Sequence, residues 1–414
     1  MPLRPGDLDL SDPDLFVAHS GPPHEYLRVL RHEAPVFWNA PPRAAKTMTP
    51  IKQGYWVLSR YDDVVNVSRH PKLFSSSEGG PYIWDMEEAA LAGQRLTMLV
   101  MDPPQHVKYR RLVQRGFTPR MIDKLEPTIR NHARNVVDRI AAKGECEFVE
   151  DLACELPLTL ICELMGVPQE MRKKIFDWSN EVIGADDPDM KAGDPMAVAM
   201  QMWMYCNTLV AEKRAKPDDA LISLLANGTV DGEALTDLEL NNFFVLLSVA
   251  GNETTRNATS QFMRLMSEHP EQFELLKSDL DRYLPDAIEE VLRFAPPVMQ
   301  FRRTAMEDTE LRGVRIAKGD KLYLSYPSAN RDEEIFGATS MQFDITRQNN
   351  DHIAFGIGEH YCLGANFARM QLRSILREMI TRLPDIHVIG RPAFQRSNFI
   401  AGVKRMPVEY TPEA

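Results

Sequence analysis

Ten residues near the C-terminal end of the chain place one cysteine in a glycine-rich loop directly before a helical segment: Phe355-Gly356-Ile357-Gly358-Glu359-His360-Tyr361-Cys362-Leu363-Gly364. A cysteine that ligates iron must stay deprotonated, which requires nearby backbone N–H donors, a helix N-terminus and partial shielding from water. Gly356, Gly358 and Gly364 allow the backbone to approach closely. We therefore interpret Cys362 as a thiolate ligand of haem iron, and the alternative is a buried structural cysteine beside a glycine turn.

A second polar group interrupts a long apolar helical segment. Thr236-Asp237-Leu238-Glu239 is a capping box and His269-Pro270 ends the segment, which predicts a helix of roughly 30 residues, about 45 to 50 Å long. Residues 243–249 are apolar on nearly every face and are predicted to be buried all round. Ala250-Gly251-Asn252-Glu253-Thr254-Thr255 follows, and buried polar groups without partners cost about 1 to 3 kcal/mol each. A functional role would offset that cost; the alternative is a kinked core helix whose threonine hydroxyl bonds the i−4 carbonyl.

The cysteine loop resembles that of the cytochrome P-450 superfamily, the haem-thiolate monooxygenases, and matches the form F-G-x-G-x-H-x-C-x-G at every fixed position. The resemblance implies an oxidoreductase with heme b, whose iron takes Cys362 as its axial ligand. It also implies that Glu253 delivers protons and that the Thr254 hydroxyl stabilises the oxygen species at the iron. The remaining residues that it places at the haem or beside bound oxygen are Ala250, Gly251, Phe355, Gly356 and Gly364.

Haem carries two propionates, and each charge-assisted hydrogen bond to them is worth roughly 1.5 to 3 kcal/mol. Four residues at family positions are the predicted donors, namely His106, Arg110, Arg303 and His360. An ordinary surface charge is the alternative for each, and it is the preferred interpretation of Arg302.

Glu290 and Arg293 lie three residues apart on one predicted helix face. As an exposed pair they would contribute only about 0.2 to 0.5 kcal/mol. The resemblance implies instead a buried structural pair joined by an arginine from the following meander, which would be Arg347.

The regions expected to determine the substrate are apolar. The predicted pocket residues are Trp84, Leu99, Val100, Val245, Ser248, Val249, Val298, Met299 and Phe399, and the methionine-rich stretch 190–204 is the predicted roof. Core packing is the alternative for most of these residues.

Two bacterial groups share further motifs with the chain. Residues 148–158, 176–180 and 250–257 resemble enzymes that oxidise cholesterol side chains and branched lipids, whereas 324–334 and 397–399 resemble the α-terpineol hydroxylase group. The resemblance favours hydroxylation of a steroid or branched lipid, with a small monoterpenoid or alkyl-arene as the alternative. A non-oxygenating haem-thiolate binding protein or a peroxygenase is a further alternative, against which Glu253 and Thr254 argue.

Composition limits the partners of this 414-residue chain. The net charge of −11 disfavours nucleic acid and anionic membranes, and five cysteines without a C-x-x-C pair argue against a disulfide framework and a zinc site. No run approaches the roughly 20 apolar residues of a membrane helix, and no signal peptide is evident, so we expect a cytoplasmic protein. The resemblance implies a protein of bacterial type, and a monomer is the simplest expectation. Lys108, Arg111 and Arg115 could form a basic patch for an acidic 2Fe-2S ferredoxin that receives electrons from an NAD(P)H-dependent ferredoxin reductase; an ordinary solvated helix face is the alternative.

These groups require a mainly helical scaffold with small sheets. We expect a mainly α fold with small β-sheets (α+β), one domain over residues 1–414, in which 1–60 and 313–325 contribute to the small β region. The resemblance implies the cytochrome P-450 fold, a triangular helical body with haem between the long central helix and the cysteine loop. The first 35 or so residues are expected to be irregular, residues 36–38 and 55–59 to pair as a hairpin, and 318–320 to form a turn between two short β runs.

Overall fold

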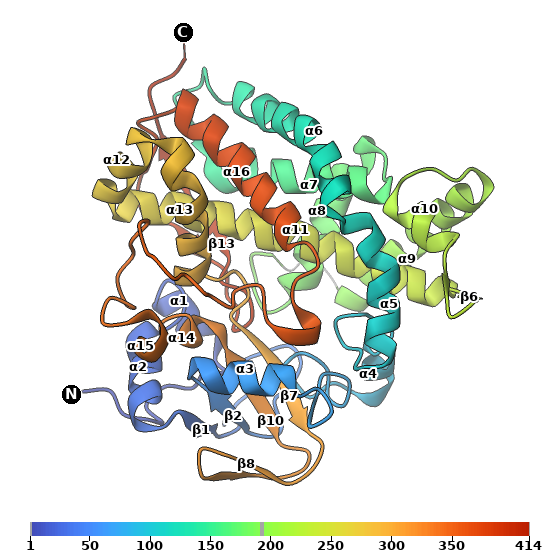
Figure 1. Ribbon diagram of the computed structural model, residues 1–414, viewed down its shortest axis with the longest axis vertical. Coiled ribbons are helices and arrows are strands. Elements are labelled where there is room, and N and C mark those ends of the chain that lie inside the picture. The colour runs from blue at the N-terminus through green and yellow to red at the C-terminus, as the bar shows by residue number, and fades with distance from the viewer. Residues whose placement is uncertain (1, 191–193, 414) are drawn as a thin grey trace.

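The computed structural model describes residues 2–190 and 194–413, apart from the side chains of Arg115, Pro119, Arg120 and Met121. Figure 1 shows most helices in the upper part of the molecule and a small sheet with α3 in the lower part. The architecture is therefore a helical body with sheets at its edge, as the sequence predicts.

Helices make up most of the described chain. The α-helices are α1 Pro13–Ala18, α2 His24–Glu33, α3 Tyr61–Arg69, α4 Glu88–Gln94, α5 Gln105–Val113, α6 Pro119–Asp138, α7 Glu155–Met165, α8 Arg172–Ile183, α9 Pro195–Ala215, α10 Leu221–Ala226, α11 Asp237–Glu268, α12 Pro270–Ser278, α13 Leu280–Phe294, α14 Tyr326–Ala329, α15 Glu333–Phe336 and α16 Ala365–Arg382. Short 3-10 or π segments are η1 Gln114–Phe117, η2 Val149–Ala153, η3 Gln169–Met171 and η4 Gly358–His360.

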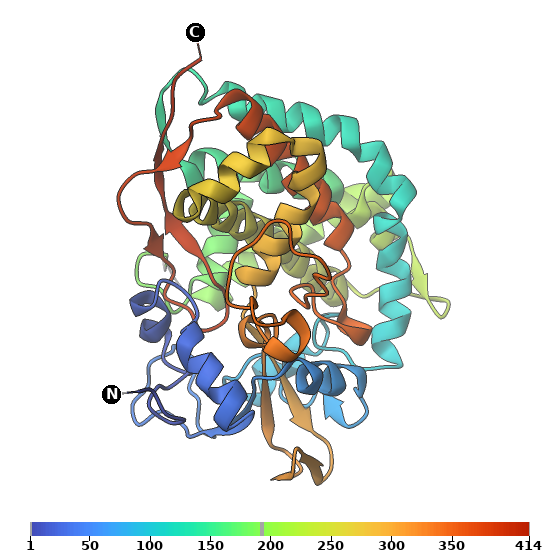
Figure 2. The same ribbon diagram turned by 60° about the vertical axis from the view of Figure 1, so that its left-hand side comes forward.

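The strands are short. They are β1 Val36–Asn39, β2 Tyr55–Leu58, β3 Phe74–Ser75, β4 Glu145–Glu147, β5 Thr229–Val230, β6 Glu233–Ala234, β7 Gln300–Ala305, β8 Thr309–Leu311, β9 Val314–Ile316, β10 Lys321–Ser325, β11 His387–Val388, β12 Ala393–Phe394, β13 Val403–Arg405 and β14 Pro407–Glu409. The largest sheet has the order β1-β2-β10-β7-β3. Figure 2 shows the C-terminal strands along one edge, above the N-terminal helices.

The predicted hairpin is confirmed, because β1 pairs antiparallel with β2. The turn at residues 318–320 is present, but the strands on either side of it do not pair: β9 pairs with β8, while β10 pairs with β7 and β2. The prediction of an irregular N-terminal segment was wrong. The side chain of Asp12 caps α1, and α2 buries Tyr26, Leu27 and Leu30, so the apolar spacing after each proline was a usable helix signal.

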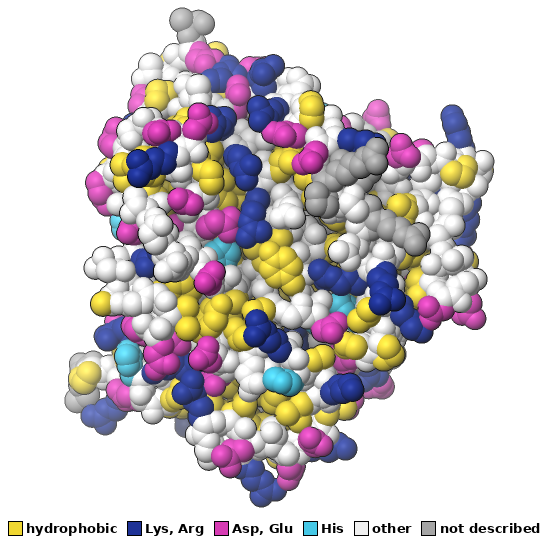
Figure 3. Space-filling model, viewed as in Figure 1, with side chains coloured by type: hydrophobic (Ala, Val, Ile, Leu, Met, Phe, Trp, Pro, Cys, Tyr) yellow, Lys and Arg dark blue, Asp and Glu magenta, His cyan; other side chains and the backbone are white. Residues whose placement is uncertain are grey.

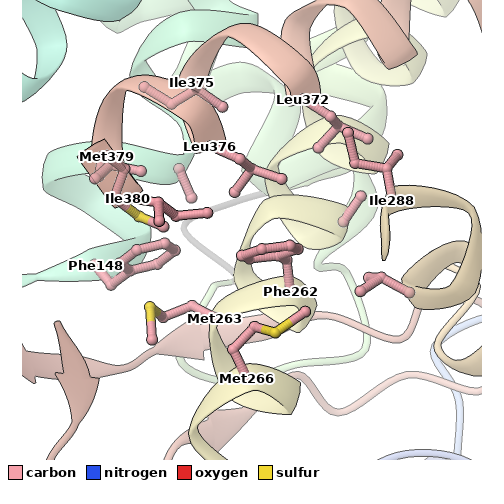
Figure 4. Packing of buried hydrophobic residues seen from close by; sticks show 14 of the residues in the cluster. Phe148, Phe262, Met263, Met266, Ile288, Leu372, Ile375, Leu376, Met379 and Ile380 are labelled. Carbon is pink, nitrogen blue, oxygen red and sulfur yellow. The ribbon is translucent and has the colours of Figure 1, made fainter. Parts of the chain in front are cut away.

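Helix α11 is the longest element and crosses the molecule (Figure 1). Its capping box is formed as predicted, with the Thr236 amide donating to Glu239 Oε2 at 2.7 Å, and the helix ends before His269. Figure 4 shows Phe262, Met263 and Met266 of its second half packed against residues of α16. This packing fixes α11 relative to the loop that precedes α16.

Candidate active site: a cavity between α11 and the cysteine loop

The middle of α11 forms one wall of an apolar cavity. Ala250, Gly251 and Thr254 line it, as do Leu246 and Leu247, so the first half of α11 is half exposed on this side rather than buried all round. A side chain at Gly251 would place its Cβ 2.6 Å from Ile161 Cδ1, which means that glycine also permits the close approach of α7. The Thr254 hydroxyl donates to the Ala250 carbonyl at 2.9 Å, while Thr254 still faces the cavity.

Glu253 points away from this cavity and is completely buried. Its Oε1 accepts hydrogen bonds from Arg256 Nη2 and, at 2.9 Å, from Asn257 Nδ2. Arg256 Nη1 also donates to Asn180 Oδ1 on α8 at 2.7 Å. Glu253 Oε2 has no partner among the described residues. The structure therefore separates the predicted pair: the alcohol is in the cavity, and the acid is on the side of α11 that faces α8.

The cysteine loop forms the opposite wall. Gly356 and Gly358 adopt φ angles of +70° and +74°, which other residues rarely adopt, and the Cys362 amide donates to the Phe355 carbonyl at 2.8 Å. Cys362 lies in the cavity wall just before α16. Burial raises the pKa of its thiol, whereas a hydrogen bond with the Gly364 backbone and the charges of Arg110 and Arg369 lower it. A cation at the sulfur would therefore favour the thiolate.

One edge of the cavity carries two arginines and two histidines, which are the predicted propionate donors His106, Arg110, Arg303 and His360. Arg110 donates to the carbonyls of Glu359 and Tyr361 at 3.2 and 2.6 Å, and Arg303 donates to the Arg302 carbonyl at 2.8 Å. Burial lowers the pKa of all four side chains. His106 Nδ1 lies 3.7 Å from Glu359 Oε2, whereas Arg110 and Arg303 form no ion pair within the described residues. Two arginines without a carboxylate partner require an anion, so this edge fits the two carboxylates of haem.

The structure corrects the interpretation of Arg302 as a surface charge, because this side chain is only 6% exposed and donates to the Trp84 carbonyl at 3.3 Å. Its burial follows from β-strand alternation, which turns Arg302 and Arg303 to opposite faces of β7. The cavity also includes Thr255, Phe301, Tyr326 and Gln371, which sequence reasoning missed.

Of the predicted substrate residues, only Leu99 and Val298 line this cavity. The others lie elsewhere: Val100 and Met299 are buried, Ser248 donates to the Phe244 carbonyl at 2.8 Å, and Val245, Val249, Trp84 and Phe399 lie outside the lining. Part of the predicted roof, residues 191–193, lies outside the described residues. Leu246 and Leu247 of α11 line the cavity instead, because they lie on a different face of the helix from Val245 and Val249.

The predicted brace is assembled away from the cavity. Glu290 and Arg293 are both fully buried and form a bidentate pair at 2.7 and 2.8 Å, and Arg347 Nε lies 3.2 Å from both Glu290 oxygens. This brace connects α13 to the chain segment before the cysteine loop.

On the outer side of the cavity edge, Arg69, Val107, Arg110, Arg111, Gln114, Gly358 and Glu359 line a polar cleft. Figure 3 shows Lys and Arg side chains gathered over α5 on this face. Lys108 is not part of this cleft, since it pairs with Asp231, and the side chain of Arg115 lies outside the described residues.

An apolar cavity with one cysteine in its wall and two arginines and two histidines on one edge fits an iron porphyrin better than a protein-ligated metal ion. Within the described residues, no group of three or more His, Cys, Asp or Glu side chains could hold a metal. The arrangement of Cys362 opposite Ala250 and Thr254 defines a haem-thiolate site.

Comparison with known proteins agrees with this geometry. Residues 47–384 match the family Cytochrome P450, and the chain belongs to this family; it is a haem-thiolate monooxygenase. A steroid C26-monooxygenase of Rhodococcus jostii is 40% identical over 99% of this chain and 86% of the relative. A methyl-branched lipid omega-hydroxylase of Mycobacterium bovis is 38% identical over 98% of this chain and 95% of the relative. A Mycobacterium marinum cytochrome P450 in complex with pseudoionone has a TM-score of 0.90 and 36% identity, covering 99% of this chain and 100% of that one.

None of the described helices is both long and apolar enough to span a membrane.

Proposed function

We propose that this cytochrome P450 hydroxylates a hydrophobic steroid or branched-lipid substrate with electrons from an acidic ferredoxin. The observation that carries the proposal is the apolar wall formed by Leu246, Leu247, Leu99 and Val298 around the space between Ala250 and Cys362. Such a wall offers a substrate few polar partners, so hydrocarbon is the favoured occupant. The printed activities of the relatives, on steroids and on methyl-branched lipids, support the same class.

Different residues of the chain have different roles in the proposed reaction. Haem with a thiolate ligand supplies oxygen activation when bound. Cys362 is the proposed ligand, and the two arginines and two histidines of the cavity edge would hold the haem carboxylates. The Thr254 hydroxyl holds a proton on the cavity side of α11, and the buried carboxylate of Glu253 moves protons toward it from the α8 side. The apolar wall excludes bulk water, so that protons reach the cavity by the route through Glu253 and not directly from solvent.

The substrate class can be tested by adding steroids, methyl-branched lipids and a monoterpenoid/alkyl-arene panel to the ferric protein and following its Soret spectrum. Saturating responses to steroids or branched lipids alone support the proposal, and responses to the small panel alone replace it with the alternative. Leu247→Phe, which fills part of the cavity, should weaken the response about tenfold. Leu238→Phe is the matched control, because Leu238 is 42% exposed on the same helix.

The electron donor is proposed from the polar cleft beside α5. Arg69 and Arg111 are exposed in this cleft, which also includes Arg110 of the cavity edge. An acidic partner bound there would therefore lie close to the proposed haem. Arg111→Glu should slow reduction by a ferredoxin about tenfold at low salt. Lys108→Glu reverses a charge outside the cleft and should have a much smaller effect. Equal effects of the two changes would argue against docking at this cleft.

A cytoplasmic location, a monomeric state and a single domain over the whole chain stay predictions.

A further inference from the structure

Tyr326 places a phenol hydroxyl at the cationic edge of the cavity. It is the first residue of α14, it follows β10 directly, and it is 2% exposed while still lining the cavity. Its backbone N–H donates to the Met299 carbonyl, and its carbonyl accepts from the Asn330 N–H. Its hydroxyl forms no hydrogen bond within the part of the chain that the structure describes. The phenol is therefore a free donor that faces the cavity.

Local strand geometry explains this position. Strand β10 pairs with β7 in a register that sets Leu322 opposite Arg303 and Leu324 opposite Phe301. Because alternate side chains share one face of a strand, Arg303 and Phe301 both point into the cavity. The ring of Tyr326 continues this face, packed edge-on against the Phe301 ring at 6.1 Å between centroids. Two residues of β7 and one of α14 thus form a continuous wall.

The hydroxyl has two neighbours that define its surroundings. A Cβ built on Gly356 of the cysteine loop would lie 4.0 Å from Tyr326 Oη and 3.5 Å from the His360 carbonyl. The absence of a side chain at Gly356 therefore keeps the space between Tyr326 and the loop open. The charge of Arg303 also acts on Tyr326, lowering a pKa that burial raises. Tyr326, Arg303 and His360 thus share one corner of the cavity.

We propose that Tyr326 is a haem-binding residue whose hydroxyl donates a hydrogen bond to the same haem carboxylate that Arg303 holds. A phenol is both a donor and an acceptor, but a cationic neighbour on this edge makes donation to an anion the favourable use. The proposal rests on the placement of haem in this cavity, and it is independent of the substrate.

The variant Tyr326→Phe removes only the hydroxyl. Without this donor the haem carboxylate loses one hydrogen bond, so transfer of haem from the ferric, substrate-free protein to excess apomyoglobin should become about fivefold faster. The carboxylate charge would also be less neutralised, which favours the ferric state. The reduction equilibrium should shift about threefold toward ferric haem, about 28 mV lower for a one-electron couple.

Tyr323→Phe is the matched control, because Tyr323 lies three residues earlier, outside the cavity lining, with its ring stacked on Tyr55 at 5.7 Å. This control should retain the wild-type haem-transfer rate and potential. The proposal is overturned if Tyr326→Phe matches wild type in both measurements, if the control shows the same shifts, or if Tyr326→Phe alters only the affinity for substrate. A wild-type protein without a thiolate-type haem spectrum would overturn the haem placement itself, so the two failures can be distinguished.

Discussion

Two buried acid–arginine pairs share the same helical spacing and differ in how completely they are hydrogen-bonded. Glu290 and Arg293 on α13 are both fully buried, and every oxygen and nitrogen of the two charged groups has a partner. Glu253 and Arg256 on α11 are 0% and 4% exposed, yet Glu253 Oε2 and Arg256 Nε have no partner among the described residues. The side-chain amide of Asn252, beside Glu253, has none either.

The difference indicates that the two pairs serve different purposes. A buried polar atom without a partner costs about 1 to 3 kcal/mol, and a domain has only about 5 to 15 kcal/mol of stability in total. A pair that serves only the fold should therefore be satisfied, as the α13 pair is. Incomplete satisfaction is expected where function requires a group to exchange partners or protons. This contrast supports the assignment of Glu253 to proton movement.

The largest predicted effect is that of Glu290→Gln. Both Glu290 oxygens accept from several donors, including the Asp344 amide at 2.9 Å on Oε1 and Asn350 Nδ2 at 3.1 Å on Oε2. A glutamine would turn an NH2 group toward such donors and leave buried arginines without their counter-charge. We expect a loss of about 3 to 5 kcal/mol, measured by urea unfolding and by the yield of haem-containing protein. If the urea midpoint of Glu290→Gln equals that of the wild type, the brace does not stabilise the fold.

The matched change Glu253→Gln should cost less stability than Glu290→Gln. Among the described residues, only Oε1 of Glu253 accepts hydrogen bonds, so the amide nitrogen can take the position of the unpartnered Oε2 without facing a donor. We expect a loss of about 1 to 3 kcal/mol, because Arg256 loses one counter-charge whereas Glu290→Gln removes that of two arginines, while product formation falls about 100-fold because the amide cannot carry protons. The rate of product formation and the urea midpoint check this together. Destabilisation equal to that of Glu290→Gln would remove the contrast between the pairs.

A smaller effect is expected at Thr254, whose hydroxyl is in the cavity. Thr254→Ala should keep normal NADH consumption but lower the product formed per NADH about tenfold, since one hydrogen bond near the reacting oxygen is lost. Thr254→Ser keeps the hydroxyl and is the control. Unchanged coupling in Thr254→Ala would mean that the bond from Thr254 to the Ala250 carbonyl is purely structural.

Local motifs explain why much of the site was predictable. The cysteine loop, the capping box at Thr236 and the Glu290–Arg293 spacing each combine residue type with short-range geometry, and the structure brings their residues to the expected places. The wrong choice of Val245 and Val249 as cavity residues of α11 could have been avoided from the helical spacing. Counting back four and seven positions from Thr254 gives Ala250 and Leu247, which face the cavity, and not Val245 or Val249.

Long-range pairing explains what the sequence could not provide. The position of Tyr326 depends on the register of β10 with β7, and the partners of Glu253 depend on the contact between α11 and α8. Neither contact leaves a periodic pattern in the chain. The burial of Arg302 also required knowledge that residues 79–84 cover that face of β7.

The smallest predicted effect concerns Glu289, which neighbours the α13 pair and is more exposed. Burial raises its pKa, but hydrogen bonds from Arg369 at 2.7 Å and from His352 at 3.0 Å outweigh this and lower the pKa from 4.5 to about 2. The resulting stabilisation is fully present above pH 4.5 and is lost as the pH falls toward 2. Because the carboxylate is 27% exposed, solvent screening reduces it to about 1 kcal/mol. The difference in urea midpoint between wild type and Glu289→Gln should therefore narrow as the pH is lowered from 6 to about 3.5. A difference that stays constant over this range would show that the Glu289 charge does not stabilise the fold, whereas the fully buried Glu290 should remain indispensable at every pH in it.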